Sequence, residues 1–297
     1  MLATVLFVTM NSAVKYLGAH LPTVELVWAR TLAHLIFMVA LFAPAHGGWR
    51  LFVTHRPGLH LARSLLLLVS TSLFFTALRY VPLAEATAVS FTSPFMVALL
   101  AGWVLRERVT RAHWLAIAVG FAGALLVIRP GMGAVNPYLF LVAGNAACYA
   151  GYQVLTRRAA AYDRPETSVS YDALVGTVLL SAIVPFFWQT PARAEHWVLL
   201  AVIGVLGGLG HYCGARALVA TAASTLAPLY YVQLISAAAL GYLLFGDVPS
   251  VWTWAGAALI VASGVVIAWW ETLGRPPGGP TGAGGPGGLG GPSRPPI

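Results

Sequence analysis

Polar and aromatic side chains recur at helical spacing inside the apolar stretches of this chain. In the clearest stripe, Asn145, Tyr149 and either Tyr152 or Gln153 fall on one face of a helix. An amide and two phenols combine hydrogen-bonding groups with aromatic surfaces, a mixture typical of small-molecule pockets. The alternative is hydrogen bonding between helices, worth about 1 kcal/mol or less per bond in a membrane, together with aromatic packing.

Other apolar stretches carry similar side chains near their centres. Asn11 lies in the first stretch, and Tyr230, Tyr231 and Gln233 lie in the ninth. Each alone could equally be a packing residue, but together they suggest one shared cavity that binds a small polar solute. The predicted binding residues are Asn11, Tyr149, Tyr152, Gln153, Tyr230, Tyr231 and Gln233.

Basic and bulky residues near this predicted cavity suggest further roles. Arg30 and His34 are four residues apart, and Trp28 precedes them. Arg30 could bind a substrate carboxylate through two hydrogen bonds, or, as we favour, could hold a gate or support the structure. Trp28 could line the cavity or belong to the interfacial aromatic belt, and we group it with Arg30 as a gating or structural residue. His211 could carry a coupling proton, since histidine titrates near neutral pH, or could be a hydrogen-bonded structural residue.

Motifs for catalysis and for metal binding are missing from the sequence. It contains no HExxH, GxSxG or paired-aspartate motif, and no nucleotide-binding loop. Cys148 and Cys213 lie inside apolar runs without metal-ligand spacing, and we interpret them as packing residues. The sequence therefore predicts no enzyme activity, no catalytic residue, no metal and no cofactor.

The elements that must position these residues are apolar and long. The chain is 59% hydrophobic and 9% charged, against about 25% charged in a typical soluble domain. A run of about 20 apolar residues can cross a hydrocarbon core of about 30 Å as a helix. Ten such spans are predicted, at 2–20, 23–43, 60–80, 83–105, 112–129, 137–157, 168–188, 196–218, 222–245 and 250–270.

Two segments depart from this pattern. Pro94 interrupts the fourth span and removes a backbone donor there, which predicts either a freed carbonyl beside a cavity or a simple packing kink. Residues 272–297 are rich in Gly and Pro, and a segment with so little to bury is expected to be disordered.

The basic residues predict the orientation of the chain. The net charge is +8, and the arginines gather in alternate connections between spans, as in cytoplasmic membrane loops rather than in a nucleic-acid-binding face. Both termini are then cytoplasmic. The connections assigned to the cytoplasm contain Arg50, Arg56, Arg63, Arg106, Arg108, Arg111, Arg157, Arg158, Arg164 and Arg216, whereas the outer ones contain Arg79, Arg129 and Arg193.

The two halves of the sequence resemble each other when shifted by about 140 residues. Ala77-Leu78 then falls on Ala217-Leu218, and Trp114 falls on Trp254. Five spans precede residue 135 and five follow it, and an odd repeat must re-enter the membrane in the opposite sense. The predicted fold is therefore an all-α membrane protein of ten transmembrane helices in two inverted five-helix repeats, 1–134 and 135–271.

The passage from residue 77 to 131, with Pro94 and Glu107-Arg108, resembles the drug/metabolite transporter superfamily, specifically bacterial EamA-type exporters. Arg30 also matches a family position, whereas Leu234 stands where a second Pro94 would map. Within the family, the amino-acid exporters of the YddG type are the most similar. The resemblance implies alternating-access export of amino acids, including aromatic ones, across the bacterial inner membrane.

Other functions remain open on the residues alone. The same phenols and amides suit sugars, nucleosides and other metabolites, and a channel or an intramembrane enzyme is a further alternative. The expected partners are a small-molecule substrate and the lipid bilayer, with no nucleic acid and no obligate protein partner.

Overall fold

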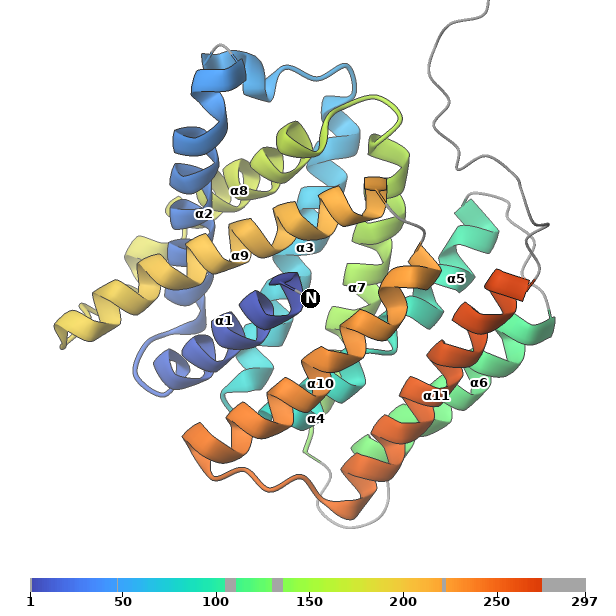
Figure 1. The fold of residues 1–297 in the computed structure, drawn as a ribbon. Coiled ribbons are helices and arrows are strands. Elements are labelled where there is room, and N and C mark those ends of the chain that lie inside the picture. Colours follow the sequence, from blue (N-terminus) through green and yellow to red (C-terminus); the bar gives the residue numbers. More distant parts are fainter. Residues whose placement is uncertain (1, 47, 105–110, 130–135, 221–222, 274–297) are drawn as a thin grey trace, which may run out of the picture.

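The chain folds into a bundle of helices, seen here in a computed structural model (Figure 1). The structure describes residues 2–46, 48–104, 111–129, 136–220 and 223–273, so the predicted disordered tail lies almost entirely outside it. Two short 3-10 helices are η1 (Gly48–Phe52) and η2 (Val184–Phe186). The α-helices are α1 (Leu2–Gly18), α2 (Thr23–His46), α3 (Pro57–Leu78), α4 (Leu83–Ser90), α5 (Ser93–Val104), α6 (Arg111–Ile128), α7 (Tyr138–Ala159), α8 (Pro165–Ser181), α9 (Ala194–Ala220), α10 (Ala223–Phe245) and α11 (Val251–Leu273).

These helices correspond to the ten predicted spans, with the fourth span divided into α4 and α5. Three of them, over Thr23–Pro44, Pro57–Leu78 and Ala194–Arg216, are individually long and apolar enough to cross a membrane. Large apolar side chains such as Ile36, Val198 and Ile235 are exposed on the outside of the bundle. Lipid is the solvent that suits such a surface, because hydrocarbon does not penalise exposed apolar side chains as water does.

The break in the fourth span is a consequence of Pro94. A proline ring collides with the carbonyl group four residues earlier, and that residue is Ser90, the last residue of α4. Tighter turns bridge the gap, since the Thr92 amide donates to the Val89 carbonyl at 3.0 Å and the Phe95 amide to the Thr92 carbonyl at 3.1 Å. The predicted interruption is confirmed. The corresponding helix of the second half, α10, is continuous, as the absence of a matching proline predicted.

The seventh span differs from its prediction. We expected it to cover 168–188, but α8 begins at Pro165 and ends at Ser181. Proline is favoured in the first turn of a helix, where its missing N–H has no intrahelical partner, and this sets the start. The chain then passes through η2, which contains Pro185. Asp172 accordingly lies near the middle of α8.

The helix contacts follow a paired pattern. α3 packs on α7, and α9 packs on α1; α3 packs on α8, and α9 packs on α2; α5 packs on α7, and α10 packs on α1. In each of these three pairs, the second contact is obtained from the first by replacing both helices with the helices of the spans five places away in the chain. The contacts α2–α8, α4–α10 and α6–α11 are unchanged by the same exchange. The α6–α11 pair forms one edge of the bundle in Figure 1.

Glycines let α9 approach α2 closely. A Cβ atom built on Gly204 would lie 2.8 Å from the carbonyl oxygen of Arg30 and 2.9 Å from the amide nitrogen of His34. A Cβ on Gly208 would lie 2.5 Å from the His34 ring. A Cβ on Gly214, by contrast, would meet nothing. The close approach brings Arg30 and His34 of α2 against α9.

Candidate functional site

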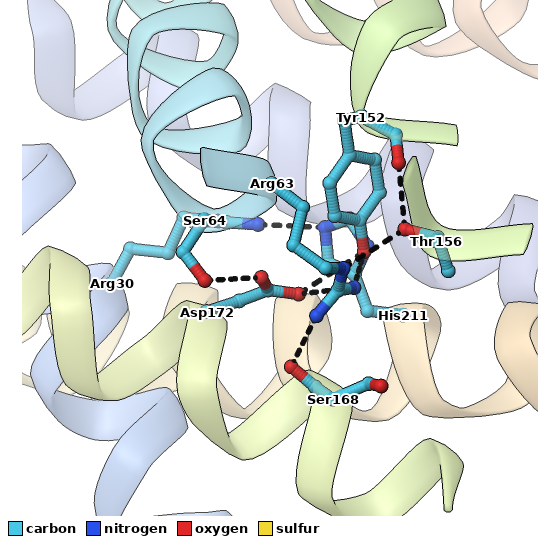
Figure 2. Close-up of polar contacts among 8 residues, drawn as sticks. All are labelled: Arg30, Arg63, Ser64, Tyr152, Thr156, Ser168, Asp172 and His211. Carbon is cyan, nitrogen blue, oxygen red and sulfur yellow. Dashed lines mark hydrogen bonds and ion pairs between the residues drawn. The ribbon is translucent and has the colours of Figure 1, made fainter. Parts of the chain in front are cut away.

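A fully buried ion pair lies between α3 and α8 (Figure 2). Nη2 of Arg63 lies 3.0 Å from Oδ2 of Asp172. The other nitrogens of Arg63 donate to the Ser168 carbonyl oxygen at 2.6 Å and to Thr156 Oγ1 at 3.1 Å. Burying these two charges is costly unless they are paired and fully hydrogen-bonded, and this site meets both conditions.

Tyr152 of α7 joins the same network. Its hydroxyl group accepts a hydrogen bond from Arg63 Nη2 and donates one to Asp172 Oδ2, each at 3.1 Å. The other carboxylate oxygen of Asp172 accepts from Ser64 at 2.9 Å. The three helices α3, α7 and α8 are therefore linked through a single carboxylate.

A second buried cation lies beside this network. Arg30 of α2 is 3% exposed, and its Nη2 lies 2.9 Å from Nε2 of His211 on α9. Since arginine only donates, His211 must accept through a deprotonated Nε2, and its ring is then neutral with the proton on Nδ1. The His211 ring also lies edge-on to Tyr152, with 6.2 Å between centroids. The Arg30 guanidinium lies 5.9 Å from the ring centre of Phe75.

A small cavity opens between these groups. Its lining combines polar groups with a few leucines, and its interior has room for about one water molecule. Two lining residues are buried and carry nitrogens without a hydrogen-bond partner among the described residues, namely Arg30 at Nε and His34 at Nε2. The lining residues are Arg30, Thr31, His34, Leu67, Leu68, Thr71 and Asp172.

The residues predicted from the α7 stripe divide between the network and its surroundings. Tyr152 is buried in the network, and Tyr149 stacks on it with 5.5 Å between ring centroids. Gln153 is half-buried. Asn145 donates to Ser70 Oγ at 2.7 Å and accepts from Ser90 Oγ at 3.1 Å, so it bonds α7 to α3 and α4. Its contacts match the interhelical alternative that we considered for this stripe.

The remaining predicted residues lie elsewhere in the bundle. Asn11 is buried in α1, and Gln233 is half-buried in α10. Trp28 donates to Ser181 Oγ at 3.0 Å, and Pro94 is exposed near the start of α5. The side chains of Tyr230 and Tyr231 lie outside the part that the structure describes. Their place in the predicted site, and that of Gln233, stays a prediction.

The sequence interpretation missed the Arg63–Asp172 pair. We counted Arg63 among the cytoplasmic connections, but Arg63 lies within α3 and is fully buried. The predicted site included no acidic residue, whereas Asp172, the eighth of the 17 residues of α8, belongs to the buried network. The available signal was one arginine and one aspartate in separate apolar runs, each too costly to leave unpaired in a membrane.

A different ion pair links α1 to the loop after α10. Lys15 Nζ lies 3.3 Å from Oδ2 of Asp247 and donates to the Val81 carbonyl oxygen at 2.8 Å. Gly246 precedes Asp247 with a φ of +69°, and this left-handed residue ends α10 in the usual manner of a helix C-terminus. Lys15 is in the last turn of α1, whereas Arg63 is in the first half of α3. As successive spans alternate in direction, the two ion pairs lie towards opposite ends of the bundle.

A third polar cluster joins the loop before α3 to the loop before α8. Oδ2 of Asp163 accepts from Thr54 Oγ1 at 2.6 Å and lies 2.9 Å from His60 Nε2. Burial alone would raise the pKa of Asp163, but the hydrogen bonds from Thr54 and His60 hold it below its ordinary value. The carboxylate therefore stays ionised and holds the two loops together at neutral pH.

Comparison with known proteins identifies the family. The chain matches the EamA-like transporter family over residues 1–129 and again over residues 136–269. It belongs to that family. The riboflavin transporter of Vibrio cholerae is 32% identical to this member over 271 residues, which cover 90% of each protein. The pseudopaline exporter of Pseudomonas aeruginosa is 30% identical over 90% of this chain and 93% of its own length.

Two further similarities extend the comparison. The S-adenosylmethionine uptake transporter of Rickettsia felis is 28% identical over 86% of each protein. A solved crystal structure superposes with a TM-score of 0.67 at 20% identity, covering 92% of this chain and 98% of its own, and so shares the fold. This EamA-like protein is thus a multi-pass membrane protein of the drug/metabolite transporter superfamily. It is a secondary transporter of small metabolites and not an enzyme.

Proposed function

We propose that this transporter exports small polar metabolites, with amino acids, including aromatic ones, as the first candidates, across the inner membrane by alternating access. The observation that carries the proposal is the buried polar network of Arg30, Arg63, Tyr152, Asp172 and His211 in an otherwise apolar bundle. Ionisable groups at this depth are expensive and mark substrate or ion pathways in membrane proteins.

Two inverted five-helix repeats are the architecture that we propose for this mechanism. The helix contacts are preserved when spans are exchanged five apart, and the family matches twice along the chain, which supports repeats of about 1–134 and 135–271. Such repeats place the substrate site between the halves near the bilayer midplane. The network combines both halves of the sequence, which supports this proposal, because Arg30 and Arg63 come from the first half and Tyr152, Asp172 and His211 from the second.

The two ion pairs between the halves fit alternating access. Lys15–Asp247 and Arg63–Asp172 each join one half to the other, towards opposite ends of the bundle. We propose that opening to one side breaks one pair while the other persists. With both termini cytoplasmic, Arg63–Asp172 closes the cytoplasmic side and Lys15–Asp247 the outer side. His211 is the proposed proton carrier, because a proton on Nε2 would remove its hydrogen bond from Arg30.

Amino acids are proposed because the site offers cations, phenols and amides together. Tyr149 and Tyr152 stack beside the Arg30–His211 pair and could accommodate an aromatic side chain. The rest of the proposed lining is Asn11, Gln153, Tyr230, Tyr231 and Gln233, with Trp28 and Pro94 in gating or structural roles. The relatives named for riboflavin, S-adenosylmethionine and pseudopaline make those solutes necessary members of any substrate panel.

The test is uptake into proteoliposomes containing the purified protein. The panel consists of labelled amino acids, sugars and nucleosides with the three named solutes, each measured with and without a pH gradient. We expect saturable uptake of at least one amino acid, above the level of protein-free vesicles. Uptake of sugars or nucleosides without amino acids would replace the proposed substrate class, and no uptake of any solute would refute the proposal.

A further inference from the structure

Arg30 is a buried cation without a counter-ion in its surroundings. Among the described residues, no carboxylate lies within ion-pair distance of its guanidinium, and its nearest hydrogen-bond partner is the neutral ring of His211. Asp172 is close enough to interact electrostatically with Arg30, but its carboxylate is already hydrogen-bonded to Arg63, Ser64 and Tyr152. The local balance of two arginines and one aspartate leaves a net positive charge inside the bundle.

Such a charge is unfavourable unless something neutralises it. An isolated ion in the protein interior costs several kcal/mol even after relaxation, which is why buried charges are normally paired. The cation–π contact with Phe75, at 5.9 Å, offsets only a small part of this. Gly207 leaves room for the Arg30 side chain, because a Cβ atom built on Gly207 would lie 3.1 Å from Arg30 Nε.

The cavity beside Arg30 has the right chemistry for a small anion. Arg30 Nε and His34 Nε2 are buried nitrogens without partners, and both residues line the cavity with Thr31 and Thr71. Arg30, His34 and Thr71 can provide N–H and O–H donors, whereas the Thr31 hydroxyl already donates to the Trp28 carbonyl oxygen at 2.9 Å. The acidic lining residue, Asp172, is already hydrogen-bonded to Arg63, Ser64 and Tyr152. Planar guanidinium groups match carboxylates through two parallel hydrogen bonds. As it stands the cavity has room for about one water molecule, so an entering carboxylate group would have to displace lining side chains.

We infer that Arg30 is a carboxylate subsite, at which the acid group of the substrate provides the missing counter-ion. His34 and Thr71 complete it, and the Tyr152 ring lies close by, with 6.2 Å between its centroid and that of His211. The inference rests on the proposed function and narrows it to solutes that carry a carboxylate. Arg30 would accordingly contact substrate, and would not act only as a gate, the role favoured from the sequence.

The subsite can be tested by binding, without transport. The purified full chain in detergent is melted in sodium acetate or formate, in sodium chloride of equal ionic strength, and with acetamide as the neutral isostere. Because a ligand of the folded state raises the unfolding temperature, acetate should raise it by about 2 °C or more over chloride, and acetamide should not. Inorganic phosphate is a further arm, and a larger rise with phosphate would overturn the carboxylate assignment.

Three variants decide whether Arg30 is responsible. Arg30→Met should lose the acetate effect, and Arg30→Lys, which keeps the charge and is the safer variant to fold, should need about fivefold more acetate. Arg193→Met is the matched control, since Arg193 is exposed and pairs with exposed Glu195, and it should respond like the wild type. An unchanged response in Arg30→Lys and Arg30→Met, or no acetate effect in the wild type, would overturn the subsite.

The two failures are distinguishable. Acetate stabilisation that depends on Arg30, in a protein that transports nothing in vesicles, would leave the subsite in place and remove the proposed function. Transport of an amino acid, together with an acetate response that is the same in the Arg30 variants, would support the proposed function and remove the subsite.

Discussion

Replacing Asp172 with asparagine should destabilise the protein strongly. The substitution keeps the shape of the side chain but removes the charge that neutralises Arg63, whose side chain is fully buried. Leaving one partner of a buried ion pair unpaired costs about 3–5 kcal/mol. An amide can still accept from Ser64 at 2.9 Å, so the loss should fall mainly on the charge and not on the hydrogen bonds. We expect the unfolding temperature to fall by about 10 °C.

A second measurement separates the charge from the packing. In the double variant Arg63→Met/Asp172→Leu both charges are gone, and replacing a buried pair by apolar residues is often neutral. Its stability should therefore return to within about 1–2 kcal/mol of the wild type, well above that of Asp172→Asn. The matched control is Glu195→Gln, which breaks the exposed Arg193–Glu195 pair of nearly the same length, 3.1 Å. That change should have little measurable effect on stability, because exposed ion pairs are screened by solvent.

The assay is thermal unfolding of the purified protein in detergent, followed by the fluorescence of its tryptophans. The reasoning is refuted if Asp172→Asn melts with the wild type, because Arg63 would then not depend on this carboxylate. It is also refuted if the double variant is less stable than Asp172→Asn, because the network would then act through its hydrogen bonds and packing rather than its charge.

Three further predictions concern packing, pH and topology. Gly204→Ala should cost about 1–3 kcal/mol by overpacking, because the new methyl group meets the α2 backbone, whereas Gly214→Ala, which meets nothing, should be neutral or slightly stabilising in unfolding measurements. The stability advantage of the wild type over Asp163→Asn should be present at neutral pH and disappear as the pH falls through the lowered pKa of Asp163, below about pH 4; a difference that persists in stronger acid would contradict this. In a variant without the native cysteines, Tyr162→Cys should react with an impermeant thiol reagent only from the cytoplasm and Ala192→Cys only from outside, and both reacting from one side would refute the predicted orientation.

Much of the fold could be predicted from the sequence because the bilayer imposes simple rules. An apolar run long enough to span hydrocarbon must be helical, and a proline must interrupt a helix one turn before itself, so the spans and the break after Ser90 followed from residue types alone. The predicted end of the seventh span was wrong because apolar residues continue past Ser181 into η2. Hydropathy does not distinguish an α-helix from a 3-10 helix.

The site was predicted less well, since it depends on contacts between distant parts of the chain. Tyr152 belongs to the buried network as an aromatic stripe suggested, but Asn145, on the same stripe, bonds to neighbouring helices. Helical periodicity shows which residues share a face and not what that face meets. Arg63 was assigned to a loop because it is charged and close to the start of its span, and only the position of Asp172 across the bundle explains how it can be buried.

The central claim, that this protein is a carrier that exposes one site alternately to each side, is tested most directly by counterflow. Vesicles containing the protein are loaded with an unlabelled solute from the panel and diluted into a trace of the same solute with a label. A carrier should accumulate the label transiently above its outside concentration, because the outward flow of unlabelled solute returns the site to the outer face, and Arg30→Ala should abolish this accumulation while still inserting. A channel would let the label enter without accumulating, at a rate that does not depend on the unlabelled solute inside. That result would contradict the account.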